Sequence, residues 1–252
     1  MENASSQIDL SIQNLTYRYP GGPAVLNQVS FSVQSGEVVG LVGPSGAGKS
    51  TLLMHLNGLL PEESARSENS AAVTVHGLPV VKDHLKEIRR AVGFLFQDPD
   101  DQLFCPTVLE DVAFGPLNLG VPQQEVRDRV TTALESVGLA GYEQRSTLQL
   151  SVGERKRVCL AGILACQPSV LALDEPFSYL DPRARRALLE ILKSFEGSQI
   201  VATHDLNLVV ELCSRVLVLD NGSIQADGPT HEILADKKLM DDHGLEVPFE
   251  LR

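Results

Sequence analysis

Apolar and polar residues alternate along residues 8–33 of the chain. A period of two predicts β-strands with one buried face, because successive side chains of a strand point to opposite sides. The tetrapeptide Pro-Gly-Gly-Pro at 20–23 has the composition of a turn and divides the stretch into two strands. The apolar positions of the pattern are Ile8, Leu10, Ile12, Leu15, Val25, Val29, Phe31 and Val33.

Further along the chain, short continuous apolar runs replace the alternation. Residues 38–42, 170–173 and 200–203 are almost entirely apolar, as is typical of parallel strands that are buried on both faces. The sequence also predicts strands at 73–75 and 92–96, and a hairpin at 216–225 around an Asn-Gly turn. Strands of this kind interspersed with helical segments indicate an α/β fold.

Helical periodicity dominates the middle of the chain. We expect a helix at 108–114 that ends at Gly115-Pro116, and an amphipathic helix at 122–137 that ends at Gly138. A further helix, 155–165, follows Ser151 and Glu154, whose spacing is that of a capping box. The remaining predictions are a helical turn at 83–91, an exposed polar loop at 61–71 and two short amphipathic helices after Pro229.

A glycine-rich stretch lies between the apolar run 38–42 and a predicted helix that ends near Asn57-Gly58. It fits G-x-x-x-x-G-K-[ST], in which glycines let backbone N–H groups turn inward beside the positive end of a helix and so bind phosphate. The flanking strand and helix disfavour a chance glycine turn. We predict that Lys49 reaches the β- and γ-phosphates, that the Ser50 hydroxyl holds Mg²⁺, and that ATP is bound by Gly43, Pro44, Ser45, Gly46, Ala47, Gly48, Lys49, Ser50 and Thr51.

Polar side chains follow two of the predicted buried strands. Asp174 and Glu175 come after the run 170–173, and His204 comes after the run 200–203. The carboxyl ends of parallel strands are where α/β folds bind ligands. Beside a phosphate-binding loop, Asp174 is expected to bind Mg²⁺ and Glu175 to act on water, whereas in isolation the pair would be a solvated strand end. The other five histidines have no ligand spacing and are interpreted as structural or exposed: His55, His76, His84, His231 and His243.

Composition narrows the class of protein. The 252 residues suit one α/β domain or a domain with a subdomain. A net charge of −12 disfavours a partner made of nucleic acid and disfavours direct attachment to anionic lipid. The apolar runs are far shorter than the ~18–20 residues of a membrane span. The first residues lack the basic and apolar regions of a secretion signal, so none is expected.

Four cysteines are present, without any C-x-x-C pair. Cys159 and Cys166 are expected to share one face of a helix, where core packing is a better interpretation than metal binding or a disulfide. The pattern suits a reducing compartment. The two remaining cysteines are Cys105 and Cys213.

Taken in order, these landmarks resemble the ATP-binding subunit of ABC transporters over nearly the whole chain. The aromatic residue before the first turn is Tyr19, which on pattern alone is either a packing residue or a plate on which a purine stacks. The glutamine after a strand is Gln97, and the stretch 150–154, Leu-Ser-Val-Gly-Glu, stands in the place of the family signature. Four further landmarks complete the series: the phosphate loop, the acidic pair Asp174-Glu175, the pair Leu180-Asp181, and His204. The stretches 96–104 and 110–120 look like the energy-coupling-factor group, the cobalt-type importers of metals and vitamins.

The resemblance implies a fold and a division of the chain. The fold is a phosphate-loop ABC ATPase core with an N-terminal antiparallel β subdomain and a helical insertion subdomain. We expect residues 1–97 and 168–228 to form the nucleotide-binding α/β core with the β subdomain, and residues 98–167 to form the helical subdomain with the signature. Residues 229–252 would be a C-terminal helical tail.

The resemblance also implies roles for particular residues. Tyr19 stacks on adenine, Gln97 senses Mg²⁺ together with Ser50 and Asp174, Glu175 is the general base, and His204 contacts the γ-phosphate. Two ATPase chains pair head to tail, with Asp181 at their interface. The signature residues act on ATP held by the partner chain: Ser151, Val152, Gly153 and Glu154.

The same resemblance implies partners and a location. They are a second ABC ATPase chain, identical or different, an integral membrane coupling protein and a substrate-binding membrane protein, with no nucleic acid and no direct membrane insertion. A short helix at 100–104 would dock the membrane partner. The chain would be peripheral, on the cytoplasmic face of the cell membrane, and would power uptake of a metal ion or vitamin.

Two departures from the family pattern bear on this interpretation. The usual signature is Leu-Ser-Gly-Gly-Gln, and here Val152 and Glu154 replace a glycine and the glutamine. Valine disfavours positive φ and crowds a phosphate, while Glu154 adds negative charge, so we expect a weakened signature and a heterodimer. Phe177 and Tyr179 also stand where smaller residues are usual, and the sequence offers no reason for them.

A rival function is a soluble ABC-type ATPase that scaffolds an assembly process such as iron–sulfur cluster maturation. This function is disfavoured by two stretches that look like the energy-coupling-factor group. They are Asp-Pro-Asp-Asp-Gln-Leu-Phe at 98–104 and Phe-Gly-Pro at 114–116. Chromosome and repair ATPases are disfavoured because they need long coiled-coil insertions and a basic face.

Overall fold

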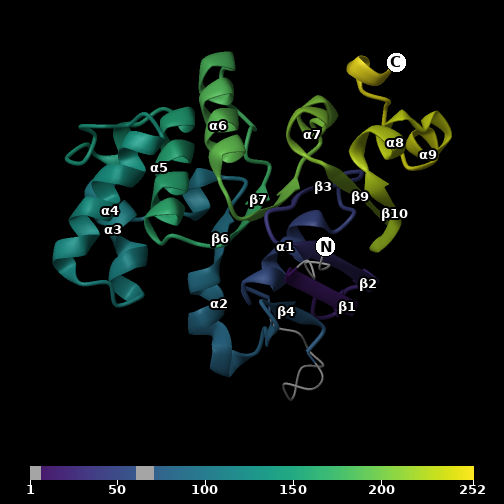
Figure 1. Ribbon diagram of the computed structural model, residues 1–252, viewed down its shortest axis with the longest axis horizontal. Helices are drawn as coiled ribbons and strands as arrows, with labels where there is room; N and C mark the ends of the chain where they lie inside the picture. Colours follow the sequence, from purple (N-terminus) through teal and green to yellow (C-terminus); the bar gives the residue numbers. More distant parts are fainter. Residues whose placement is uncertain (1–6, 61–70) are drawn as a thin grey trace, which may run out of the picture.

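The computed structural model describes residues 7–60 and 71–252 of the chain. Two predictions concern residues outside these ranges. They are the absence of a secretion signal, which concerns the start of the chain, and nearly all of the exposed loop expected at 61–71. The described part contains two β-sheets with helices around them (Figure 1).

The first sheet is antiparallel and confirms the strands expected from the alternating pattern. β1 pairs with β2 on one side and with β4 on the other, in the order β2-β1-β4-β5. The turn at 20–23 joins β1 to β2. The strands are β1 (Ile8–Arg18), β2 (Ala24–Gln34), β4 (Val73–Val75) and β5 (Leu78–Pro79).

The second sheet contains the continuous apolar runs and has the order β10-β9-β3-β8-β7-β6. Its neighbouring strands are parallel except for the β9–β10 hairpin, where Asn221 and Gly222 have φ of 49° and 74° as an Asn-Gly turn requires. The expected hairpin is therefore confirmed. The strands are β3 (Val38–Val42), β6 (Val92–Leu95), β7 (Val170–Asp174), β8 (Ser198–Ala202), β9 (Arg215–Asp220) and β10 (Ser223–Pro229).

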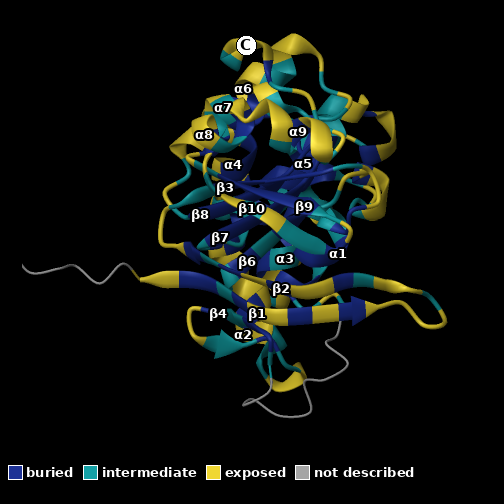
Figure 2. Ribbon diagram, turned by 90° about the vertical axis from the view of Figure 1, so that its right-hand side faces the viewer, coloured by how far each residue is buried: buried dark blue, intermediate teal, exposed yellow. Residues whose placement is uncertain are grey.

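Helix α1 (Lys49–Leu56) lies between the two sheets. Its residues Leu52, Leu53 and Leu56 are fully buried in one hydrophobic core with the inner faces of both sheets. The opposite face of the parallel sheet forms a second core with most of the other helices. Figure 2 shows the resulting layers: the antiparallel sheet below, the parallel sheet in the middle and most of the helices above. Burial on both faces explains why β7 and β8 read as continuous apolar runs.

Three helices stand together to one side of the parallel sheet: α3 (Val108–Asn118), α4 (Gln123–Ser136) and α5 (Val152–Ala165) (Figure 1). The expected end of the first helix at Gly115-Pro116 is wrong, because α3 continues to Asn118 with Pro116 inside it. Proline normally excludes the helical conformation of the preceding residue by clashing with its Cβ, and here that residue is glycine. Pro116 is also buried, so packing favours the continued helix.

The remaining helices are short, apart from α6. The expected helical turn at 83–91 and the two helices after Pro229 are found. The segment expected as a helix at 100–104 is instead a 3₁₀ turn, η3 (Pro99–Asp101), opened by Asp98, whose side chain accepts from the Asp100 N–H. The other elements are η2 (Lys82–His84), α2 (Leu85–Ala91), η4 (Thr147–Gln149), α6 (Pro182–Ser194), α7 (Leu206–Leu212), α8 (Thr230–Ala235), α9 (Lys237–Asp242) and η5 (Phe249–Leu251).

All four cysteines lie in the described ranges and are free thiols. Cys159 is buried in the helical core, as expected of a packing residue, and Cys213 is buried there too. Cys166 directly follows α5 and is half-buried. Burial raises the pKa of Cys166 to about 11 and that of Cys213 to about 12.

Candidate functional site

The phosphate loop connects β3 to α1 through three glycines with positive φ, Gly43, Gly46 and Gly48. A Cβ atom at Gly43 would lie 1.9 Å from the Leu219 carbonyl oxygen, so this position has no room for a side chain. The loop borders a cavity of ≈ 350 Å³, and polar side chains from three other segments line the same cavity together with Val25. These are Gln97, Asp174, Glu175 and His204.

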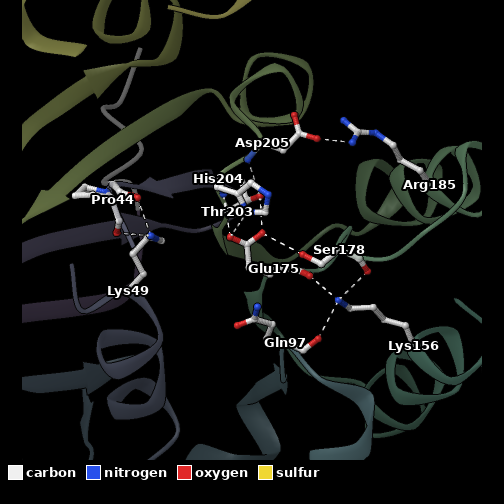
Figure 3. Close-up of polar contacts among 11 residues, drawn as sticks. Pro44, Lys49, Gln97, Lys156, Glu175, Ser178, Arg185, Thr203, His204 and Asp205 are labelled. Atoms are coloured by element: carbon white, nitrogen blue, oxygen red, sulfur yellow. Dashed lines mark hydrogen bonds and ion pairs between the residues drawn. The ribbon is translucent and has the colours of Figure 1, made fainter. Parts of the chain in front are cut away.

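Lys49 lies at the start of α1 and is folded back onto the loop. Its Nζ donates to the carbonyl oxygens of Gly43 at 2.7 Å and Pro44 at 3.0 Å (Figure 3). Burial lowers the pKa of Lys49, and the nearby Glu175 and Asp174 oppose that shift. The loop therefore places a cation beside the two carboxylates.

The parallel register brings the acidic strand end to the loop. Asp174, the last residue of β7, is opposite Ala202 of β8, and Ala202 is opposite Leu41 of β3. Burial raises the pKa of Asp174, and a hydrogen bond with the Ser50 side chain opposes that shift. Asp174 and Ser50 are thus in contact, as two ligands of one cation would be.

The donor set fits Mg²⁺ bound together with a nucleotide. A carboxylate, a hydroxyl and the amide oxygen of Gln97 on one cavity are hard oxygen ligands of the kind Mg²⁺ prefers. Within residues 7–60 and 71–252, no group of three or more His, Cys, Asp and Glu side chains is arranged to hold a metal. Mg²⁺ usually takes one or two protein carboxylates and completes its shell with substrate phosphates and water.

Glu175 is held at four points. Its Oε1 accepts from the backbone N–H of His204 at 3.0 Å and lies 2.8 Å from His204 Nδ1. Its Oε2 accepts from the Thr203 hydroxyl at 3.1 Å and the Ser178 hydroxyl at 3.4 Å (Figure 3). The backbone of Glu175 has φ of 45°, which is strained for a residue with a side chain. Strain of this kind persists where the surroundings fix the conformation, and functional sites are common locations for it.

His204 occupies the tip after β8 and has a largely exposed side chain, 77% accessible. The next residue, Asp205, caps α7 by accepting from the Leu208 N–H at 3.1 Å and forms an ion pair with Arg185 of α6. The imidazole is therefore anchored on one side by Glu175 and open to the cavity on the other. The sequence singled out His204 but gave no sign of Arg185.

The signature residues form the start of α5 and are not among the residues that line the cavity. Ser151 and Glu154 make the expected capping box: the Ser151 hydroxyl donates to Glu154 Oε2 at 2.7 Å, and the Glu154 N–H donates to Ser151 Oγ at 3.3 Å. The Tyr142 hydroxyl donates to the other carboxylate oxygen at 2.9 Å. Hydrogen bonds from Ser151 lower the pKa of Glu154, so its negative charge is retained.

The expectation that Val152 would need positive φ is wrong. Val152 is the first residue of α5 and is not among the non-glycine residues with positive φ. A first helical position tolerates a β-branched residue, since its side chain has no preceding turn to crowd. Its side chain is 37% exposed, so its methyl groups still add bulk to the surface beside Ser151.

Tyr19 and Asp181 lie at the edges of the site. The Tyr19 hydroxyl is 3.2 Å from Thr51 Oγ1, and the ring packs edge-on against Tyr17 while remaining 41% exposed. Tyr19 therefore reaches α1 without lining the cavity itself. Asp181 is the N-cap of α6 and accepts from the N–H groups of Arg183 and Ala184, both at 2.8 Å.

The structure gives a reason for one of the two unexplained residues. Phe177 is buried in the helical core, and the Arg185 guanidinium lies 5.8 Å from its ring centre. Tyr179 is 75% exposed with φ of 65°, and nothing in the structure explains a tyrosine there.

Two residues that contact the site, Thr203 and Lys156, were not predicted from the sequence. Thr203 holds the Glu175 carboxylate, and its position directly before His204 was the available signal. Lys156 lies on the apolar face of α5 and is 2% exposed. Lys156 is at helical spacing from Cys159, Leu160 and Ile163, so it lies on the apolar face of the predicted helix. This spacing was the sequence feature that could have indicated a buried lysine.

Comparison with known proteins identifies the family. The family model described as ABC transporter matches residues 26–178. The chain belongs to this family. A putative ABC transporter ATP-binding protein of Gloeobacter violaceus is 50% identical over 244 residues, which cover 96% of this chain and 98% of the relative.

Further relatives define the group within the ABC family. The energy-coupling factor transporter ATP-binding protein EcfA of Methanothermobacter thermautotrophicus is 44% identical over 244 residues, 95% of this chain and 76% of the relative. The solved structure of CbiO1 from Clostridium perfringens, part of the ABC transporter complex CbiONQ, matches with a TM-score of 0.78 and 34% identity, covering 94% of each chain. The ABC ATPase fold and the resemblance to the energy-coupling-factor group are thus confirmed. The chain is an ATP-hydrolysing subunit of a transporter of this type, and the assembly-scaffold alternative is not favoured.

Proposed function

We propose that this ABC ATPase powers the uptake of a metal ion or vitamin through membrane partners, and that hydrolysis takes place in the cavity beside the phosphate loop. The observation that carries the proposal is the convergence of Lys49, Asp174, Glu175 and His204 on this one cavity. They come from the carboxyl ends of two neighbouring parallel strands, β7 and β8, and from helix α1, which follows β3. An anion-binding loop, a cation-binding pair and a carboxylate base are the parts that phosphoryl transfer to water requires.

In this proposal each part of the phosphate loop has its own task. The loop N–H groups and the start of α1 bind the phosphates of ATP, and Lys49 turns from its own loop carbonyls to the β- and γ-phosphates. Ser50, Asp174 and Gln97 would hold Mg²⁺, which would neutralise phosphate charge. Tyr19 supplies an exposed aromatic ring near Thr51 on which adenine stacks.

Glu175 is proposed as the general base. Its carboxylate lines the cavity and is fixed by Thr203, Ser178 and His204, so it is pre-oriented toward a water molecule in line with the γ-phosphate. His204, open to the cavity, would contact the γ-phosphate. The base and the phosphate contact are thereby linked through one hydrogen bond.

A second ATPase chain would complete the site. The signature residues do not line this chain's own cavity. They act on nucleotide only if another chain brings its phosphate loop to them. These residues are Ser151, Val152, Gly153 and Glu154. Asp181, exposed at the start of α6, would lie at that interface. Because Glu154 keeps its negative charge and engages the Ser151 hydroxyl, this chain's signature is a poor anion site, which favours a heterodimer.

The membrane partner would dock beside β6 and α3. Phe104 and Phe114 are 65% and 47% exposed and pack edge-on with ring centres 4.7 Å apart. They line a groove of ≈ 400 Å³ that also includes Phe96 and Gln102, next to the segment expected to contact the transporter. No helix in the described ranges is both long enough and apolar enough to cross a bilayer. We therefore propose peripheral attachment at the cytoplasmic face through this groove.

Purification from the native cell in mild detergent tests the transport proposal. A tagged chain should bring down integral membrane proteins, and a second ATPase chain if the dimer is mixed, and mass spectrometry would identify them. The variant Phe114→Asp should lose the membrane proteins while it still binds ATP. A complex made only of soluble assembly proteins would contradict the proposal.

A further inference from the structure

A buried lysine, Lys156, lies between the catalytic segments without lining the cavity. It is 2% exposed and projects from α5 into the interior. Burying an ammonium group is costly unless hydrogen bonds replace its water, so its partners show what it does in the fold. An apolar side chain of similar size would avoid that cost.

The Lys156 ammonium donates to three backbone carbonyls in two segments of the chain, one at Gln97 and two in the turn 175–178 (Figure 3). The distances are 3.1 Å to Gln97, 2.5 Å to Glu175 and 3.5 Å to Ser178. An ammonium has three donors and no acceptor, so these contacts use its full capacity. Gln97 leads into the segment proposed to face the membrane partner, and Ser178 belongs to the turn that leads to Asp181.

The contact with Glu175 acts on a strained part of the backbone. Glu175 has φ of 45°, and its carbonyl oxygen also accepts from the Ser178 N–H at 3.2 Å. The Ser178 hydroxyl in turn contacts the Glu175 carboxylate at 3.4 Å. Because Lys156 binds the carbonyl oxygens of both Glu175 and Ser178, it fixes the turn 175–178. This turn then fixes the direction of the Glu175 side chain.

We propose that Lys156 is a positioning residue that joins the Gln97 segment, the Glu175 backbone and the turn before Asp181 into one unit. A displacement of the Gln97 segment by the membrane partner, or of the turn by a second chain, is then transmitted to the carboxylate of Glu175. The catalytic part of the inference rests on the proposed role of Glu175 as general base. The mechanical part, that the Gln97 segment and the turn 175–178 move together, does not.

The first test is steady-state ATP hydrolysis by the complex that the full chain forms with its partner chains. Lys156→Met should lower kcat by about 10- to 100-fold with KM for ATP within about 3-fold, since a small misplacement of a catalytic group has effects of this size. Lys156→Arg, which retains the charge and several donors, should recover most of the loss. Arg157→Met is the matched control: this neighbouring cation of α5 also binds two backbone carbonyls, of Val137 and Gly138, but away from the catalytic segments.

Two kinetic results would overturn the inference. One is a kcat for Lys156→Met no lower than that of Arg157→Met. The other is a loss that appears in KM alone. If Glu175→Gln leaves hydrolysis intact, the proposed base is wrong, and that failure is separate from the behaviour of Lys156.

Hydrogen exchange tests the mechanical part without using activity. In Lys156→Met, or in Lys156→Gln if the methionine variant does not fold, amides in 97–101 and 175–181 should both exchange faster, while α1 is unchanged. Arg157→Met should instead affect amides near 137–142, where Leu139 and Tyr142 donate to backbone carbonyls. Faster exchange in only one of the two segments, or in neither, would contradict the proposal.

Discussion

Glu175 and His204 follow adjacent parallel strands, and His204 Nδ1 lies 2.8 Å from Glu175 Oε1. The backbone N–H of His204 donates to the same oxygen at 3.0 Å, so one residue fixes the carboxylate in two ways. The ring faces the cavity with 77% of its surface exposed. This relationship gives the site both an oriented base and a group that is free to contact phosphate.

Replacing the ring should therefore impair the chemical step. His204→Ala is expected to lower kcat by about 100-fold, because the Glu175 carboxylate loses a contact that orients it, with ATP binding nearly unchanged. Phosphate release at saturating ATP and fluorescence titration with a labelled nucleotide measure the two effects. His231→Ala is the control, because this histidine is exposed on α8. Equal activity of the two variants would contradict the assignment of His204.

The tight position of Gly43 should make the loop intolerant of a methyl group. Gly43→Ala places a Cβ 1.9 Å from the Leu219 carbonyl oxygen at φ of 151°, so the loop must distort and ATP affinity should fall at least about 10-fold, or 1.4 kcal/mol. Gly21→Ala is the matched control, since it also has positive φ, 73°, but nothing within 4 Å of the added atom. Both are measured by nucleotide titration. A similar affinity for the two variants would show that the loop does not need this close approach.

The capped signature should reduce self-association. With Glu175→Gln as a background that slows hydrolysis, this chain alone should form little ATP-dependent dimer, because Glu154 retains its charge and engages Ser151. Adding Glu154→Gln and Val152→Gly should increase the dimer fraction seen by size-exclusion chromatography with light scattering. If Val152→Gly leaves the ATPase activity of the assembled complex unchanged, the idea of a weakened site fails.

The thiols of Cys166 and Cys213 should react slowly with alkylating reagents in the folded protein. Burial raises the pKa of Cys213 to about 12 and that of Cys166 to about 11, so at pH 8 their reactive thiolate form is rarer than in the unfolded chain. Iodoacetamide followed by peptide mass spectrometry should label both residues slowly in buffer and quickly in guanidinium chloride. Rapid labelling of Cys213 in native buffer would show that the helical core opens readily.

Much of the site was predictable because its parts are local in sequence. The glycines and Lys49 occur within nine residues, and Asp174-Glu175 directly follows an apolar strand, so spacing and strand position together place them at one sheet edge. The alternating and continuous apolar patterns predicted the strands, and the resemblance to the ABC family implied their division between a β subdomain and a core. The proposed roles of Tyr19, Asp181 and the signature residues stay predictions, as do the subdomain boundaries.

What the sequence did not predict depends on tertiary contacts. The end assigned to α3 was wrong because Gly115 removes the clash that normally precedes proline and packing holds Pro116 inside the helix. Val152 begins α5 in helical geometry, so the positive φ that valine disfavours does not arise there, while its crowding of a phosphate stays a prediction. Lys156 meets Gln97 and Glu175 across sequence separations of 59 and 19 residues, so only its apolar neighbours marked it in the sequence.

The most direct test of the account is a comparison of ATP hydrolysis and ATP binding by Glu175→Gln. Glutamine keeps the size of the side chain and one carbonyl oxygen, which can accept from the His204 N–H, but it does not accept a proton from water. The account predicts a fall in hydrolysis of at least about 100-fold with unchanged affinity for ATP in the presence of Mg²⁺. Hydrolysis at the wild-type rate, or loss of ATP binding with the fold intact, would contradict it.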